Sequence, residues 1–196
     1  PYEEFKLKKS PSNRTYLSTE ELNALKEHDL NHNLTLIKIR DIFIFSVYTG
    51  LRFVDAQMLT MDRIIKSNEG KYMLNIVQEK TGEALTIPFL LPAVKIMEKY
   101  NDSPERKMLN RVIPTMSNQK LNSYLKVIAS LVGITKTLSH HVARHTCATT
   151  VLLNNEVPME VVSKWLGHTS IKTTQIYGKI TNNYMQKIAD KLEGKI

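Results

Sequence analysis

Three histidines and one arginine stand within residues 139–145, in a segment that reads SHHVARHTCAT from residue 139 to residue 149. On a helix, residues three or four apart share a face, so His141 lines up with Arg144 and, one step further round, with His145. A guanidinium presents a rigid fork to phosphate oxygens, and a histidine beside it can donate or move a proton. The pair of His141 and Arg144 therefore predicts an anion site.

A metal site is the main alternative for two histidines four residues apart. Arg144 stands on the flank of that pair as a permanent cation, which repels a metal ion. The segment also has no glutamate where a zinc hydrolase helix needs one, and no cysteine pair lies nearby. We therefore expect no metal here. His145 is followed by three small residues, so we interpret it as a buried residue of a closely packed helix.

Two further polar residues follow in the segments WLGHTS (165–170) and TTQIYGK (173–179). His168 comes directly after Gly167 at a predicted helix break, which places its ring at a turn. Tyr177 stands nine residues later. Taken alone, one tyrosine among eight is far more often a packing residue than a chemical one.

The elements that must position these residues are mostly helices. Ser18 and Glu21 form a predicted capping box that starts a helix ending near Asp29, and Gly50 ends a second helix over 34–49. Three β-rich runs separated by NEG and EKTG predict a three-stranded antiparallel sheet within 62–88. Further helices are expected at 54–59, 91–100, 119–132, 139–154, 159–166, 170–177 and 182–193. The predicted class is mainly α with a small antiparallel sheet (α+β).

Composition narrows the class of partner. The chain has 196 residues and a net charge of +8, which favours a polyanion such as nucleic acid. No apolar run approaches the roughly 20 residues of a membrane span, so we expect no membrane partner. The single Cys147 excludes an internal disulfide and fits a reducing cytoplasm. The chain starts at Pro1, so we expect a piece of a longer protein.

Four segments, taken in order, carry a resemblance: TGLRFVDAQMLT (49–60), QEKTGEALTIP (78–88), SHHVARHTCATT (139–150) and VSKWLGHTSIKTTQIYGKI (162–180). Together they resemble the tyrosine recombinase (phage integrase) family, and especially the integrases of bacterial mobile elements such as conjugative transposons. The resemblance runs from about Tyr16 to the end of the chain. It implies that residues 18–196 form the catalytic domain. Residues 1–17 would be a lead-in from an N-terminal core-binding domain that this sequence lacks.

The resemblance also implies a site, residue by residue. It comprises Arg52, Lys80 (on the turn of the sheet), His141, Arg144, His168 and the nucleophile Tyr177. Asp55 matches an acidic residue that supports the first arginine. Cys147 departs from the family, which commonly has a bulky apolar residue there, and this departure concerns helix packing.

The implied reaction is cleavage and rejoining of DNA strands through a 3′-phosphotyrosyl intermediate, without metal, ATP or any other cofactor. Two arginines would stabilise charge on the non-bridging oxygens, His141 would accept the phenolic proton, and Lys80 would protonate the leaving 5′ oxygen. The expected partner is double-stranded DNA in the bacterial cytoplasm, at the nucleoid. The helix at 182–193 is expected to dock on a neighbouring subunit of a tetramer that forms on DNA, the free chain being a monomer.

Two other functions stay open on the sequence alone. A type IB topoisomerase-like enzyme would nick and close DNA with the same residues. A DNA-binding regulator would keep the fold and have vestigial catalytic residues, although all six polar positions of the family are present here.

Overall fold

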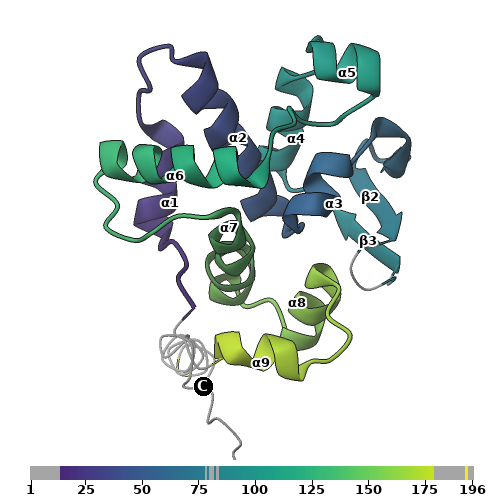
Figure 1. Cartoon of the computed structure of the whole chain (residues 1–196). Helices are drawn as coiled ribbons and strands as arrows, with labels where there is room; N and C mark the ends of the chain where they lie inside the picture. Colours follow the sequence, from purple (N-terminus) through teal and green to yellow (C-terminus); the bar gives the residue numbers. More distant parts are fainter. Residues whose placement is uncertain (1–13, 78, 80–81, 83, 179–192, 194–196) are drawn as a thin grey trace, which may run out of the picture.

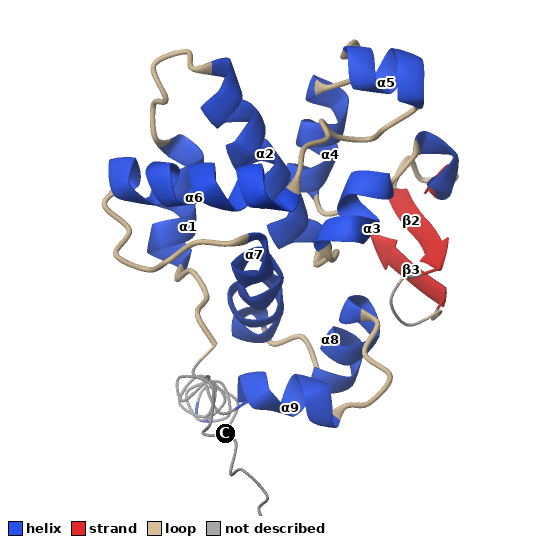
Figure 2. Ribbon diagram, in the orientation of Figure 1, coloured by secondary structure: helices blue, strands red, loops and turns tan. Residues whose placement is uncertain are grey.

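The computed structural model describes residues 14–77, 79, 82, 84–178 and 193 (Figures 1 and 2). This part of the chain is mostly helical with one small antiparallel sheet, and the predicted fold class is thereby confirmed. The α-helices are α1 (Thr19–Glu27), α2 (Leu34–Thr49), α3 (Phe53–Met58), α4 (Leu91–Lys99), α5 (Pro104–Leu109), α6 (Asn118–Val132), α7 (His140–Thr146), α8 (Met159–Leu166) and α9 (Lys172–Gly178). Nearly all of the helix expected at 182–193 lies outside the described residues.

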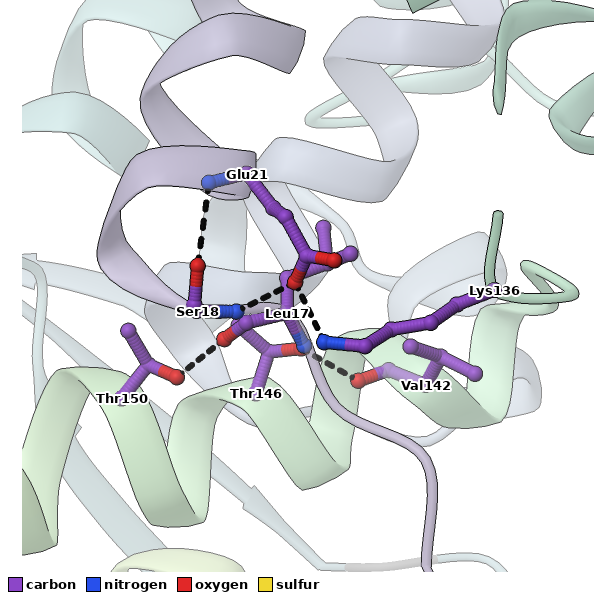
Figure 3. Close-up of polar contacts among 7 residues, drawn as sticks. All are labelled: Leu17, Ser18, Glu21, Lys136, Val142, Thr146 and Thr150. Atoms are coloured by element: carbon purple, nitrogen blue, oxygen red, sulfur yellow. Dashed lines mark hydrogen bonds and ion pairs between the residues drawn. The ribbon is translucent and has the colours of Figure 1, made fainter. Parts of the chain in front are cut away.

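The ends of the first two helices follow the local signals in the sequence. At α1 the Ser18 hydroxyl accepts a hydrogen bond from the Glu21 amide at 3.2 Å, and the Glu21 carboxylate accepts one from the Ser18 amide at 2.7 Å (Figure 3). This is the predicted capping box. At the end of α2, Gly50 adopts a left-handed conformation with φ of 71°, which ends the helix as expected.

α2 is the central helix of the fold and is buried around most of its circumference. It packs against α4, α6 and α7, which surround it in Figure 1. Its side chains Ile39, Ile42, Phe43, Phe45 and Val47 are all fully buried. Burying an aliphatic or aromatic side chain of this size contributes about 1.5–3 kcal/mol, so α2 supplies much of the main core.

The sheet has the order β1 (Ile64–Lys66), β2 (Tyr72–Val77) and β3 (Ala84–Pro88), with both pairs antiparallel. Leu74 in the middle strand pairs with Ile64 and Ile87, and Leu74 and Ile87 are buried. The sheet lies at one edge of the molecule beside α3 (Figure 2). The first strand is shorter than predicted, because a 3₁₀ turn, η1 (Met61–Arg63), precedes it.

The segment before α1 is fixed to the helix that carries the histidine cluster. The Leu17 amide donates to the Thr146 hydroxyl at 3.0 Å, and the Leu17 carbonyl accepts from the Thr150 hydroxyl (Figure 3). The Leu17 side chain is fully buried. Both polar groups of one backbone unit are therefore satisfied by two threonines one helical turn apart.

Two helical predictions need correction. The single helix expected at 139–154 is α7 followed by a π-helical turn, η2 (Cys147–Leu152), and a 3₁₀ turn, η3 (Leu153–Asn155). The hydroxyls of Thr146 and Thr149 bond to the carbonyls four residues earlier, a contact that bends helices. α5 was not predicted, although Ser103 caps it and Pro104 occupies its first position. Among the described residues, no helix is long and apolar enough to cross a bilayer.

Candidate active site

A pocket of about 390 Å³ opens where α3, α6, α7 and the turn after β2 meet. Three of the residues singled out in the sequence line it: Arg52, His141 and Arg144. Asp55 lines it as well, together with Glu79, Asn118 and Asn122. The two arginines, 92 residues apart in the chain, therefore lie around one cavity.

Arg144 is held by the ends of two helices. Its guanidinium donates at 2.7 Å to the carbonyl of Gly50, which follows α2, and at 2.6 Å to the carbonyl of Leu166, the last residue of α8. Carbonyls at helix C-termini lack intrahelical partners and carry partial negative charge, so they suit a cation. Burial, with a smaller contribution from the charge of Arg52, lowers the pKa of Arg144 to about 10, and the group stays charged at neutral pH.

Arg52 occupies the residue before α3 and is half-buried. One of its terminal nitrogens, Nη1, is buried and has no hydrogen-bond partner in the described part of the chain. Because a buried donor without a partner costs free energy, such groups in native proteins call for an explanation. An anion in the adjoining pocket would supply the acceptor.

Asp55 supports the turn after β2. It is only 7% exposed, and its carboxylate accepts a hydrogen bond from the Glu79 amide at 3.1 Å. This contact ties the residue before Lys80 to α3. Lys80 itself lies outside the described residues.

His141 is exposed at the pocket, and Nη1 of Arg14 lies 3.4 Å from its Nε2. A guanidinium can only donate, so Nε2 of His141 is the acceptor and carries a lone pair. The His141 ring also meets the His145 ring edge to face, with the ring centroids 4.2 Å apart.

His168 lies at the turn after α8, as predicted from Gly167. Its Nδ1 is 2.7 Å from the hydroxyl of Thr174, a fully buried residue of α9. Burial lowers the pKa of His168 to about 4, and the charges of Arg144 and Arg52 add to the effect. His168 is therefore neutral at physiological pH and positions the first turn of α9.

Tyr177, on α9, contacts His145 and not the histidine expected from the sequence. Its hydroxyl lies 2.6 Å from Nδ1 of His145, and both side chains are buried, at 2% and 4% exposure. The interpretation of His145 as a buried residue is correct, but its polar partner was missed. The sequence held no signal for this contact, because it depends on how α9 packs against α7.

The acid–base properties of this pair follow from burial. Burial, together with the surrounding positive charges, lowers the pKa of His145 to about 3. Burial also raises the pKa of Tyr177, against the opposing effect of the Arg144 and Arg14 charges. Both groups are neutral, and a phenol O–H is a stronger acid than the N–H of a neutral imidazole, so we assign the Tyr177 O–H as the donor to Nδ1. Because the pKa of His145 is lowered and that of Tyr177 is raised, transfer of the phenolic proton to His145 is unfavourable in this state.

A known protein family matches most of the chain. The model of the phage integrase family matches residues 15–183 of the chain. The chain belongs to the phage integrase family. Among curated relatives, the tyrosine recombinase XerC of Listeria monocytogenes is 27% identical to this chain over 184 residues. The alignment covers 87% of this chain and 59% of XerC. The chain is 31% identical over 149 residues to XerD of Pseudomonas putida, covering 71% of this chain and 48% of XerD.

Solved structures of integrases and recombinases share the fold. XerH bound to its palindromic difH substrate in a post-cleavage complex aligns with a TM-score of 0.70 at 19% identity, over 92% of this chain and 54% of XerH. The Tn1549 transposon integrase in complex with transposon right end DNA also aligns with a TM-score of 0.70, at 15% identity, over 97% of this chain and 71% of that one. The chain spans less than two thirds of the length of the two curated relatives, XerC and XerD.

Proposed function

We propose that this chain is the catalytic part of a site-specific tyrosine recombinase that cleaves and rejoins double-stranded DNA. Arg52 and Arg144, which line one pocket, carry the proposal, because a phosphodiester needs cationic donors on its non-bridging oxygens. The net charge of +8 suits a DNA partner. Residues 18–196 would form the catalytic domain, with residues 1–17 leading in from a DNA-binding domain.

In the proposed reaction the Tyr177 oxygen attacks the scissile phosphorus and the bond from phosphorus to the 5′ oxygen breaks. The phenolic proton passes to His141, whose Nε2 carries a lone pair at the pocket. The leaving 5′ oxygen takes a proton from Lys80. The products are a 3′-phosphotyrosyl ester and a free 5′ hydroxyl, and attack by another strand's 5′ hydroxyl reverses the step without ATP.

Bound DNA would meet a preorganised charge pattern. Arg144 is fixed by two carbonyls and Arg52 has a buried amino group available. Donors that need no reorganisation as charge develops are the most effective form of transition-state stabilisation, and losing one costs about 100–1,000-fold in rate. His168 would keep α9, and with it Tyr177, close to this pair.

We extend the proposal to the assembly and its biological role. The free chain would be a monomer, and the segment 182–193 would dock on a neighbouring subunit in a tetramer on DNA. The likeness to the Tn1549 transposon integrase favours integration or excision of a mobile element, at the bacterial nucleoid. Chemical crosslinking with and without recombining DNA tests the assembly, and a chain that stays monomeric while it recombines DNA would contradict it.

The reaction itself is tested with nicked duplexes of random sequence. A nick a few nucleotides to the 3′ side of the cleavage point makes the fragment with the free 5′ hydroxyl short. This fragment diffuses away, so the covalent intermediate accumulates. We expect a detergent-stable adduct whose DNA is attached to the peptide containing Tyr177. A chain that binds the duplexes and forms no adduct would be a DNA-binding regulator. Strand joining between two separate duplexes distinguishes a recombinase from a topoisomerase-like enzyme.

A further inference from the structure

The hydroxyl of Tyr177 lies outside the phosphate pocket. The pocket is lined by Arg52, His141 and Arg144 but, among the residues that the structure describes, Tyr177 is not part of its wall. The His145 ring contacts both the His141 ring, at a centroid distance of 4.2 Å, and the Tyr177 ring, at 5.5 Å. The phenol is therefore one imidazole ring removed from His141, which lines the pocket.

The Tyr177 ring is anchored in apolar surroundings of its own. It belongs to a second, smaller core cluster that η2 and α8 build with Leu152, Val162 and Leu166. With an exposure of 2%, the ring is closed off from solvent, and its one polar atom faces His145. A nucleophile in this position is protected from solvent and is already paired with His145.

Two histidines hold one face of α9. Thr174 and Tyr177 are three residues apart and so lie on the same side of the helix. Thr174 pairs with His168 at 2.7 Å and Tyr177 with His145 at 2.6 Å. The first contact fixes the start of α9, and the second fixes the end that carries the hydroxyl. Releasing the second contact alone would free the tyrosine while the helix stays attached.

We infer that His145 is a positioning residue that holds Tyr177 in a buried resting position outside the phosphate pocket, and that strand cleavage begins with the breaking of this hydrogen bond. The phenol keeps its proton while the bond is intact, because His145 is a weak base in its buried setting. His145 thus restrains the nucleophile, and proton removal takes place at the pocket. The kinetic part of this inference depends on the proposed function, whereas the restraint on the hydroxyl does not.

The test uses two substitutions whose side chains branch in the same way and have the same number of heavy atoms. His145→Asn places an amide oxygen at the position of Nδ1, so an acceptor for the phenol remains. His145→Leu places a methyl group there and removes the acceptor. The first readout is nitration of Tyr177 by tetranitromethane in the intact chain, followed by mass spectrometry of the peptide. Tyr124, which is 36% exposed, serves as the internal standard.

We expect His145→Leu to be nitrated at Tyr177 about three- to tenfold faster than the parent chain, the factor that corresponds to one neutral hydrogen bond. His145→Asn should stay within about twofold of the parent. Equal nitration of the parent and the Leu variant would overturn the inference. So would equal acceleration in both variants, because that pattern reports lost packing.

The second readout is the single-turnover rate of adduct formation on a nicked duplex. Release from a restraint predicts that the Leu variant forms the adduct at least as fast as the parent. A Leu variant that loses adduct formation while the Asn variant keeps it would show that cleavage needs an acceptor at this position, which contradicts the inference. If no chain, the parent included, forms an adduct, the proposed function fails and nitration alone decides whether His145 holds the tyrosine.

Discussion

The backbone amide of Glu79 donates a 3.1 Å hydrogen bond to the buried carboxylate of Asp55. Asp55 is on α3, three residues after Arg52, which immediately precedes this helix, and Glu79 directly precedes Lys80. One carboxylate therefore links the segment that carries the first arginine to the turn that carries the lysine. A rearrangement of the turn would therefore alter the position of α3, and a shift of α3 would alter the turn.

The role proposed for Lys80 predicts a rescue. If Lys80 protonates the leaving 5′ oxygen, Lys80→Ala should be nearly inactive on ordinary DNA, because an alkoxide is a strong base. Sulfur at the bridging 5′ position gives a thiolate, which leaves without a proton because thiols ionise near a pKa of about 8.5. We expect the variant to recover much of its cleavage on the sulfur-substituted strand in a gel assay.

The matched control for this rescue is Arg52→Ala. Its contribution is to the non-bridging oxygens, which the sulfur leaves unchanged, so it should stay inactive on both strands. A Lys80→Ala chain that is equally dead on both strands, or equally active on both, would exclude the lysine as the general acid.

Tyr177→Phe should abolish the covalent adduct and leave DNA affinity nearly unchanged, since no charge is lost. The substitution also leaves Nδ1 of His145 without the hydroxyl that now pairs with it. We expect a loss of about 1 kcal/mol in the free energy of unfolding, or a fall of about 2–4 °C in Tm. Gel shift, adduct assay and thermal unfolding check the three parts. An adduct that persists would move the nucleophile elsewhere, with Tyr184 as the next candidate.

Gly50→Ala should destabilise the chain far more than Gly133→Ala. Both glycines have positive φ, 71° and 78°, which costs an alanine about 1–2 kcal/mol. At Gly50 an added Cβ would also lie 2.9 Å from Leu166 and 3.1 Å from Cys147, whereas at Gly133 it would meet no described atom within 4 Å. Urea unfolding of the two variants at pH 7 measures the difference. Equal losses would mean that the contact between α2 and α8 tolerates a methyl group.

Stability should fall in mild acid because His140 cannot take up a proton when folded. Burial lowers its pKa to about 3, while its unfolded value is about 6.5. The unfolded chain therefore binds more protons below pH 6.5, so stability is complete above that pH and declines toward pH 3. His140 alone should remove about 2 kcal/mol between pH 7 and pH 5.

The control for this pH dependence is His140→Gln. A glutamine cannot titrate, and its amide can still pair with the Ser46 hydroxyl that now lies 2.8 Å from Nε2 of His140. Unfolding curves of the variant should change less between pH 7 and pH 5 than those of the parent. Parallel curves for the two chains would show that His140 is not the group responsible.

Local signals in the sequence predicted most of the elements. The capping box at Ser18, the glycines after α2 and α6, and the alternating runs of the sheet each act within a few residues, and the structure has the elements that they indicate. The π-helical turn after α7 could not be read in this way. Thr150 in this turn and Thr146 just before it both bond to Leu17, which is more than 120 positions away in the chain.

The candidate site also has a part that the sequence predicted and a part that depends on long-range packing. Helical spacing singled out His141 and Arg144, the family resemblance added Arg52, and the structure brings all three to one pocket. The partner of Tyr177 was not predicted, because His145 and the expected His141 lie on the same turn of one helix. Only the packing of α9 decides which ring the phenol meets.

The two arginines differ in what would preserve them over evolutionary time. Arg144 bonds the carbonyls of Gly50, just after α2, and of Leu166, the last residue of α8, so a copy of this gene without the proposed activity would still need it to fold. Selection for folding alone is enough to maintain that residue. Arg52 has a buried nitrogen, Nη1, whose hydrogen bond no described residue accepts. That nitrogen therefore does not stabilise the described part of the fold as the Arg144 guanidinium does. Among descendants of this sequence, loss of Arg52 with retention of Arg144 is therefore the expected mark of a chain that has lost the proposed activity.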